Sequence, residues 1–264
     1  MLYATALLQP MPRSIRSAFL FLGTLALAAG PATAQVAGYL NGAPLPYEVP
    51  PPPKAGPVVD MDMTLARALR AVPGSPEEDE AIGDAQAYLP PDIMVRFSNA
   101  AHLRLNPKTR PILLYMLSRA LPEAGRYVRH WKEAYPRSRP YVVDSTIKPC
   151  YDRLVNPRES YPSGHAANGL AAAMVIAEVV PARRQALLAR GIHYGNNRIV
   201  CGVHYQSDVY QGQLVAADYM AVLLRNAAFQ ADLECAQAEQ RRAEQEDARK
   251  PLEALPVRCE TLHL

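Results

Sequence analysis

The sequence has little excess of either charge. Its 264 residues include 28 lysines and arginines against 25 aspartates and glutamates, a formal net charge of +3. So small an excess gives no reason to expect a nucleic acid or an anionic membrane surface as a partner. Charged residues make up only 20% of the chain and hydrophobic residues 49%, which excludes an extended disordered protein and provides enough apolar side chains for a large core.

Four patterns are also missing. No segment alternates apolar and polar residues in the manner of a half-buried strand, and the chain has no internal repeat. The four cysteines include no Cys-x₂-Cys pair, so they lack the common zinc-binding pattern. Beyond residue 34 no apolar run reaches the length that spans a membrane. The absence of a strand pattern and of a repeat, together with the helix signals described below, favours an all-α protein with a single multi-helix domain.

The first 34 residues have the pattern of a secretory signal peptide. Arg13 and Arg16 precede thirteen apolar residues at 18–30, and the Ala-Thr-Ala sequence ending at Ala34 offers the small side chains that signal peptidase accepts. A transmembrane anchor is the alternative, but thirteen residues fall short of the ~20 that span a bilayer. We therefore expect cleavage after Ala34, a periplasmic or secreted mature protein, and no membrane insertion after cleavage.

An exported chain with four cysteines is expected to form disulfides. Cys150 and Cys201 both flank the chemical motifs described below, and Cys235 and Cys259 both lie near the C-terminus. Of the three possible pairings, we favour Cys150–Cys201 with Cys235–Cys259.

Proline is abundant, with 25 residues, and it marks where helices begin. Ser75 before Pro76 and two glutamates is typical of a capped helix start. Later segments show apolar residues at helical spacing. The helices expected there cover residues 107–121, 122–134, 163–180, a segment opened by Pro181, 207–228 and 229–249. Along the chain we expect a Pro-rich segment at 35–60, the main helical domain at 61–230 and a charged helical tail at 231–264.

The first candidate site residues are Lys132 and Arg139, in a Lys-x₆-Arg-Pro arrangement at the end of an expected helix and in the loop after it. Both are cationic at neutral pH and suited to an anion. The alternative is that they are solvated partners of the helix dipole. Taken alone, this motif is weak evidence of function.

The second candidate is Ser163-Gly164-His165, which follows Pro162 where an apolar helix is expected to begin. A helix N-terminus presents free N–H groups and a partial positive charge, both of which favour a bound anion. The serine adds a hydroxyl, the glycine permits close approach, and the histidine adds a titratable group. The alternative is that Ser163 is only an N-cap and His165 a surface histidine.

The third candidate is Arg198 with His204 and Asp208, spaced Arg-x₅-His-x₃-Asp. On a helix, His204 and Asp208 would share one face, so that the carboxylate accepts a hydrogen bond from one ring nitrogen and the other stays free as a nucleophile. Arg198 adds a forked cation suited to phosphate oxygens. An ordinary buried His–Asp pair is one alternative. A metal site is another, although a metal favours more carboxylates and histidines nearby.

Together the three motifs describe a cationic cage around two histidines, built at helix ends and loops. Such a cage stabilises the charge on a transferring phosphoryl group. In this order and spacing the motifs resemble the signature of the type 2 phosphatidic acid phosphatase (PAP2) superfamily, which vanadium-dependent haloperoxidases share. Within it, the sequence resembles the bacterial class A non-specific acid phosphatases. The resemblance covers roughly 45–230 and includes VPPPP, YPSGHAANGLAAAMVIAE and GNNRIVCGVHYQSDVYQGQLVAA.

The resemblance implies a role for each motif residue. His204 attacks phosphorus and forms a phosphohistidine, Asp208 orients His204, and His165 protonates the leaving alkoxide. The resemblance also implies that no metal or other cofactor is needed. The phosphate oxygens are bound by Lys132, Arg139, Ser163, Gly164 and Arg198.

Two positions depart from the family pattern. Asn197 stands where the family has a serine before the arginine, and Ala166 stands where threonine often follows the histidine. Because asparagine also donates hydrogen bonds, we expect Asn197 to support the cage with altered anchoring.

The expected function is an exported acid phosphatase that hydrolyses small-molecule phosphate monoesters, with phosphoryl transfer to alcohols as a further outcome. A homodimer is expected by analogy alone. An acidic pH optimum is expected because His204 must be neutral while His165 is protonated, and their reference pKa is ~6.5. A vanadate-dependent haloperoxidase and a non-catalytic anion-binding envelope protein are the alternatives, although pure binding needs no nucleophile.

Overall fold

A computed structural model of the chain describes residues 37–151, 156–260 and 262, so the expected signal peptide lies outside the described residues. The described residues contain no extended strand, only an isolated bridge between Arg137 and Glu159. The expectation of an all-α fold is confirmed. In chain order the helices are α1 (Pro57–Ala68), α2 (Pro76–Gln86), α3 (Pro90–Arg96), α4 (Ser98–Ala101), α5 (Pro111–Ala134), α6 (Pro140–Val143), α7 (Gly164–Val179), η1 (Pro181–Arg183), α8 (Arg184–Val200), α9 (Gln206–Leu223), α10 (Ala227–Asp247) and η2 (Val257–Cys259).

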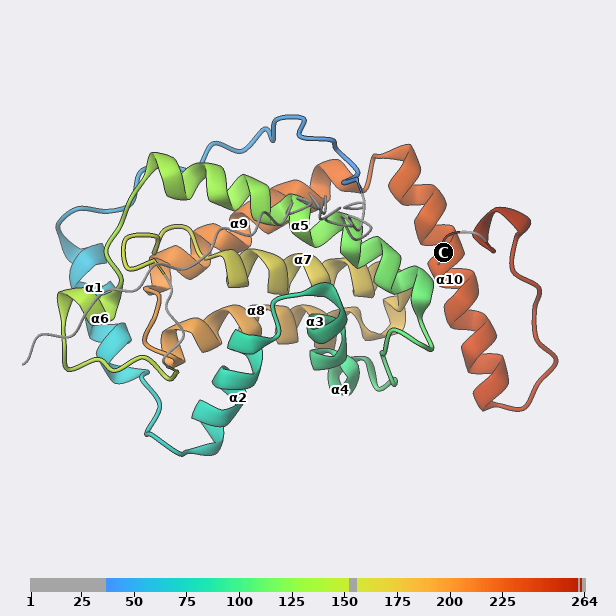
Figure 1. The fold of residues 1–264 in the computed structure, drawn as a ribbon, viewed down its shortest axis with the longest axis horizontal. Helices are drawn as coiled ribbons and strands as arrows, with labels where there is room; N and C mark the ends of the chain where they lie inside the picture. Colours follow the sequence, from blue (N-terminus) through green and yellow to red (C-terminus); the bar gives the residue numbers. More distant parts are fainter. Residues whose placement is uncertain (1–36, 152–155, 261, 263–264) are drawn as a thin grey trace, which may run out of the picture. The chain divides into compact units, whose positions relative to one another are not determined.

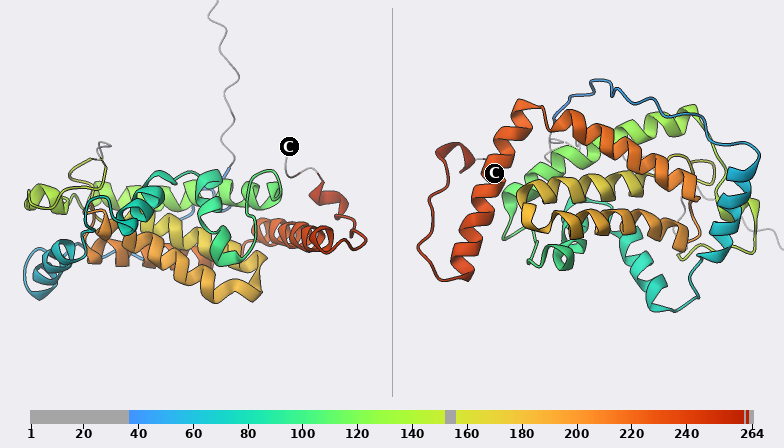
Figure 2. Two further views of the ribbon diagram at one scale, coloured as in Figure 1. Left: turned by 90° about the horizontal axis from the view of Figure 1, so that it is seen from below. Right: turned by 180° about the vertical axis from the view of Figure 1, so that it is seen from behind.

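Helix α7 lies among α5, α8 and α9, which pack against it (Figure 1, Figure 2). Its sequence is rich in alanine, and twelve of its sixteen residues are buried. A helix that is apolar all round suits a central position, and small side chains let its neighbours approach closely. Helix α7 therefore forms the centre of the core, as its composition predicts.

Helix α5 runs unbroken through Pro122, so the expectation of two helices meeting there is wrong. A proline inside a helix removes one backbone hydrogen bond. The buried side chains of Leu117, Leu121 and Val128 nevertheless follow one face across the proline at helical spacing. Because their packing into the core outweighs the lost bond, Lys132 sits near the end of one 24-residue helix.

The long helix expected over residues 207–228 is divided. Helix α9 ends at Leu223, and α10 begins at Ala227 because the Asn226 side chain accepts a hydrogen bond from the Phe229 N–H (3.0 Å). The side chain of Phe229 is buried in the same core as α5 and α7.

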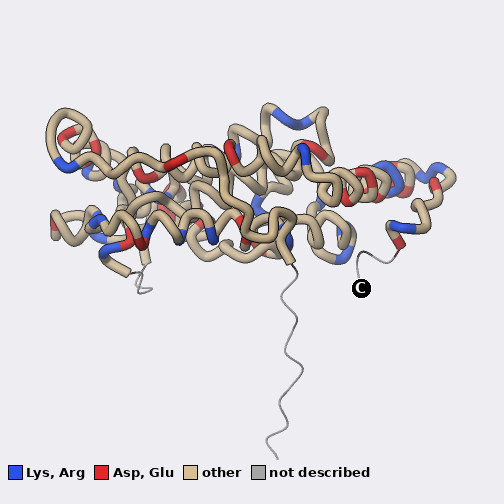
Figure 3. Tube along the Cα trace, turned by 90° about the horizontal axis from the view of Figure 1, so that it is seen from above, with Lys and Arg blue, Asp and Glu red and all other residues tan. Residues whose placement is uncertain are grey.

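Two disulfides join Cys150 to Cys201 and Cys235 to Cys259, the pairing favoured from the sequence. The first ties the loop after α6 to the residue that follows α8, and the second ties the chain end to α10. Helix α10 carries charges of both signs (Figure 3). Within the described part of the chain, no helix is both long and apolar enough to cross a bilayer.

The Pro-rich segment before α1 lies along α5 and α9 (Figure 1). The Leu40 N–H donates to both carboxylate oxygens of Glu123 in α5 (3.1 and 3.0 Å). The hydroxyl of Tyr161, which precedes α7, donates to the Pro50 carbonyl (2.7 Å). This segment therefore braces the start of α7, where the site residues lie.

Candidate active site

The three sequence motifs meet at one end of the bundle, where α5 and α8 end and α7 and α9 begin (Figure 1). Two contacts connect them. The Ser163 N–H donates to the Asp208 backbone carbonyl (2.9 Å), and Arg139 Nη1 lies 3.1 Å from His204 Nε2. Motifs that are separate in the sequence thus form one site at helix ends and loops.

Gly212 permits the close approach of α9 to the start of α7. A Cβ atom at this position would lie 2.2 Å from the Ser163 carbonyl oxygen and 3.1 Å from the Ala166 Cβ. A side chain here would push the two helices apart. Because Asp208 lies one turn before Gly212 on α9, this contact sets the distance between the His–Asp pair and the start of α7.

His204 and Asp208 form a buried pair, although not on one helical face as the spacing suggested. Asp208 is the third residue of α9, whereas His204 lies two residues before that helix begins. His204 Nδ1 lies 3.3 Å from Asp208 Oδ2, and the Tyr205 N–H donates to the same oxygen (2.9 Å). Asp208 therefore pairs with the histidine and also caps α9.

The tautomer of His204 follows from its two neighbours. A guanidinium group only donates hydrogen bonds, so Arg139 Nη1 at 3.1 Å requires a lone pair on His204 Nε2. The proton of the neutral ring then resides on Nδ1, facing Asp208. This arrangement leaves Nε2 without a proton, beside a cation.

Arg137 and Ser160 also hold Asp208, and the sequence did not single out either residue. Arg137 Nη1 donates to Asp208 Oδ1 (2.6 Å), and the Ser160 hydroxyl donates to Oδ2 (2.6 Å). Arg137 Nη2 also donates to Asp62 Oδ2 in α1 (2.8 Å). The one available signal was that Arg137 lies inside the first motif, two residues before Arg139; nothing in the sequence linked Asp62 to the site.

Backbone carbonyls hold two of the cations in place. The Arg139 guanidinium donates to the carbonyl oxygens of Asn156 (2.9 Å), Glu159 (3.0 Å) and Val203 (2.8 Å). Lys132 Nζ donates to the same Glu159 carbonyl. Neutral carbonyls orient cations without cancelling their charge, so both cations keep their attraction for an anion.

Arg198 is a buried cation with unused donors. The residue is only 1% exposed, and its Nη2 atom lies 3.4 Å from the Tyr151 hydroxyl. Among the described residues, its Nε and Nη1 atoms have no hydrogen-bond acceptor. A buried guanidinium is costly unless its donors are satisfied, so Arg198 indicates a site for an oxyanion.

The clustered cations change the protonation of their neighbours. Burial and the charge of Arg139 lower the pKa of Lys132 to about 7. Burial, together with Arg139 and Lys132, lowers the pKa of His204 well below its ordinary value. His204 is therefore neutral, and able to act as a nucleophile, in mildly acidic solution.

His165 lies in the first turn of α7, beside the rings of Tyr88 (4.8 Å between centroids) and Tyr194 (6.1 Å). Its Nε2 donates to the Ala85 carbonyl (3.0 Å), which leaves Nδ1 to exchange a proton. Burial and Arg198 lower the pKa of His165 well below its ordinary value, whereas a general acid must carry a proton. A phosphate dianion beside these groups would raise this pKa.

Ser163 has the N-cap role that was its alternative interpretation. Its Oγ accepts a hydrogen bond from the Ala166 N–H (3.3 Å), and the hydroxyl proton is still available to a ligand. Gly164 is the first residue of α7. A Cβ there would meet Tyr88 Oη at 3.6 Å and Val128 Cγ1 at 3.7 Å, which are ordinary contacts. Packing therefore does not require glycine at this position.

Asn197 anchors α8 to α2. Its Nδ2 donates to Asp84 Oδ2 (2.8 Å), and the fully buried Asp84 also pairs with Arg190 and Arg96. Because Arg198 is the next residue on α8, this contact holds the cage arginine through its helix. Asn197 therefore does donate a hydrogen bond, whereas its support of the cage stays a prediction.

The described residues contain no group of three or more His, Cys, Asp or Glu side chains arranged to hold a metal ion. The expectation of a metal-free reaction stays a prediction.

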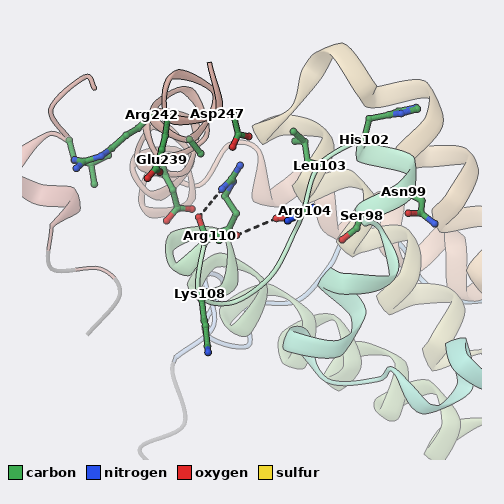
Figure 4. A pocket seen from close by; sticks show the side chains of 14 residues that line it. Ser98, Asn99, His102, Leu103, Arg104, Lys108, Arg110, Glu239, Arg242 and Asp247 are labelled. Carbon is green, nitrogen blue, oxygen red and sulfur yellow. Dashed lines mark hydrogen bonds between the residues drawn. The ribbon is translucent and has the colours of Figure 1, made fainter. Parts of the chain in front are cut away.

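A hollow of 1320 Å³ lies at the other end of α5, between α4 and α10 (Figure 4). Cationic and acidic side chains both line it. Its buried arginine, Arg110, already donates to Gln240 Oε1 (2.9 Å) and to the Thr109 carbonyl (2.9 Å). With its charges mixed and Arg110 already paired, this hollow lacks the convergent cations of the site at the opposite end.

The fold and the site define a class of protein: a helical bundle that holds a buried His–Asp pair against a cluster of cations. The model of the PAP2 superfamily matches residues 111–230, which include all three motifs. The chain is 36% identical over 190 residues to the non-specific acid phosphatase of Salmonella typhimurium, covering 71% of this chain and 76% of that protein. It is 33% identical over 211 residues to the acid phosphatase of Zymomonas mobilis, covering 78% of each chain. The chain belongs to the PAP2 superfamily.

Proposed function

We propose that this chain is an exported acid phosphatase that hydrolyses small-molecule phosphate monoesters through a phosphohistidine at His204. Its relatives, acid phosphatases that match it over more than two thirds of its length, support the activity. One observation carries the mechanism: His204 Nε2 lies 3.1 Å from the Arg139 guanidinium, while Nδ1 lies 3.3 Å from the Asp208 carboxylate. A nucleophile among cations suits attack on an anionic phosphoryl group.

In this proposal the three cations and the start of α7 bind the phosphate oxygens. Arg198 gives the most direct support, because two of its buried donor atoms lack acceptors among the described residues. Three positive charges compensate the dianion and the charge that spreads over its equatorial oxygens during transfer. The binding groups are the side chains of Lys132, Arg139, Arg198 and Ser163 and the N–H of Gly164.

The reaction would proceed in two steps. First, His204 Nε2 attacks phosphorus; the N–P bond forms, the P–O bond to the leaving group breaks, and the alkoxide takes a proton from His165. Asp208 stabilises the ring while it carries the phosphoryl group. Second, water attacks phosphorus, gives a proton to His165 and releases inorganic phosphate from His204. An alcohol in place of water would receive the phosphoryl group instead.

Export and cleavage after Ala34 belong to the same proposal. Two disulfides support an oxidising compartment. The homodimer expected by analogy stays a prediction.

The test compares turnover of an aryl phosphate by the mature protein and by His204→Ala. We expect the variant to lose at least about 10³-fold in kcat while it still binds inorganic phosphate. A rapid denaturing quench at alkaline pH, where the N–P bond of a phosphohistidine survives, should trap a phosphorylated wild-type protein and an unphosphorylated variant. His193→Ala is the matched control, because this exposed histidine pairs only with Glu80 among the ion pairs of the described residues (3.2 Å), and it should keep wild-type kcat.

Wild-type activity should also survive dialysis against EDTA. Turnover that persists in His204→Ala would refute the nucleophile, and activity lost to EDTA and restored by a metal would refute the metal-free mechanism. A wild type that hydrolyses no phosphate ester, yet oxidises halide when vanadate is added, would favour the haloperoxidase instead.

A further inference from the structure

A chain of hydrogen-bonded side chains leads from the His–Asp pair to α1. Arg137 Nη1 donates to Asp208 Oδ1 (2.6 Å) and to the Ser207 hydroxyl (2.7 Å). Arg137 Nη2 donates to Asp62 Oδ2 (2.8 Å), and the Ser207 N–H donates to Asp62 Oδ1 (2.9 Å). Both aspartates are almost fully buried, at 2% and 0% exposure. We call Asp62, Arg137 and Asp208 the relay.

We propose that Arg137 and Asp62 are positioning residues for the nucleophile, and that they act on His204 through Asp208. Arg137 occupies Asp208 Oδ1, so Oδ2 is the oxygen that meets His204 Nδ1. Asp62 holds Arg137 from the other side, which prevents the guanidinium from turning away. The inference rests on the proposed function, because it assigns both residues to a reaction at His204.

The relay also sets the charge behind the nucleophile. Asp62, Arg137 and Asp208 together carry one net negative charge. Without Arg137, two carboxylates would be buried close together, a costly arrangement that holds protons more tightly. Burial raises the pKa of Asp208, and the charge of Arg137 opposes that increase.

The other groups that face His204 are cations and a second histidine. The cations lower the proton affinity of His204. A net negative charge in the relay, which meets His204 at Nδ1, should act in the opposite direction. A change in relay charge should therefore move the pH at which His204 becomes neutral. The facing groups are Arg139 from the start of α6, Lys132 from α5, Arg198 from α8 and His165 from α7.

Two substitutions change the relay charge in opposite directions. Arg137→Gln removes a cation and should move the acid limb of kcat/KM to higher pH by about one unit. Asp62→Asn removes an anion and should move the same limb to lower pH. In Arg137→Gln, kcat at the optimum should fall on the order of tenfold to hundredfold, with KM within about threefold, because orientation is lost while the phosphate cage stays intact. Arg137→Lys keeps the charge and should keep the limb at its wild-type position.

Arg119 offers a matched control for Arg137. It pairs with the buried Asp232 (2.8 Å) and lies over the Tyr39 ring (3.8 Å), as Arg137 lies over the ring of Tyr205 (4.1 Å). Asp232 belongs to α10, which lies at the other end of the bundle from the starts of α7 and α9 (Figure 1). Arg119→Gln should therefore lower thermal stability, as a broken buried ion pair does, and leave the pH profile unchanged.

Three results would overturn the proposal: an unshifted acid limb in Arg137→Gln, shifts of the same sign in the two relay variants, or a loss of kcat that only tracks the unfolded fraction. If Arg137→Gln does not fold, the other two variants test the proposal. The acid limb should stay in place in Arg137→Lys and should move to lower pH in Asp62→Asn. This inference alone is overturned if the wild type is active, His204→Ala is inactive, and the relay variants have the same kcat and pH profile as the wild type. A wild type without phosphatase activity overturns the proposed function instead.

Discussion

Lys132 is the group in the proposed site whose charge changes nearest to neutral pH. Burial and Arg139 lower its pKa to about 7, so the protein carries all three cage cations below this pH and loses one above it. Above pH 7, a phosphate ester that needs all three cations must bind together with a proton. With a pKa of about 7, KM should be about twice its low-pH value at pH 7 and about tenfold higher at pH 8, a loss of about 1.4 kcal/mol in binding free energy.

The assay is the KM of an aryl phosphate between pH 6.5 and 9, where the ester is mostly a dianion because its second pKa is about 6. In the free protein His204 and His165 do not titrate in this range, since both pKa values lie well below it. Lys132→Arg keeps its charge throughout and should show a flat KM. The KM of Lys132→Met should also be independent of pH, but at pH 6.5 it should be higher than that of the wild type. A flat wild-type KM, or a rise that persists in Lys132→Arg, would refute the reasoning.

Two further predictions concern packing and stability. Gly212→Ala would place a Cβ 2.2 Å from the Ser163 carbonyl, so we expect a loss of about 1–3 kcal/mol in unfolding free energy and of at least about tenfold in kcat/KM. Gly125→Ala, whose Cβ would have its nearest contact at 3.5 Å, should keep stability within about 1 kcal/mol, and equal behaviour of the two variants in urea unfolding would contradict the close approach. Glu239 accepts from two N–H groups at the start of α5, and burial raises its pKa from 4.5 to about 7. Burial in the folded state disfavours the charged form of Glu239. The unfolding free energy of the wild type should therefore fall by roughly 3 kcal/mol relative to that of Glu239→Gln as pH rises from 4.5 to 7. If urea unfolding shows a difference that does not change with pH, burial does not raise the pKa of Glu239.

Helices were predictable where the local signal agreed with the tertiary packing. Ser75 does cap α2, accepting from the Glu78 N–H (3.2 Å), and the apolar run after Ser163 does form a buried helix. Prediction was wrong where tertiary packing outweighed a local signal: Pro122 lies inside α5 because both sides of it pack into one core. It was also wrong where an N-cap was overlooked, as at Asn226 between α9 and α10.

By itself, the sequence determined which chemical groups are available: a pair of histidines, three cations and a helix start, in an order that identified the family. These signals are local, because capping, charge and motif spacing depend on neighbouring residues. Only the tertiary structure decided which partners these groups have and how readily they hold protons. The contacts of Arg137 with Asp208 and Asp62 join residues 71 and 75 apart, and pairing at that separation leaves no periodic trace in the sequence. The lowered pKa of Lys132 likewise depends on burial beside Arg139, which exists only once α5 and the loop after it are folded together.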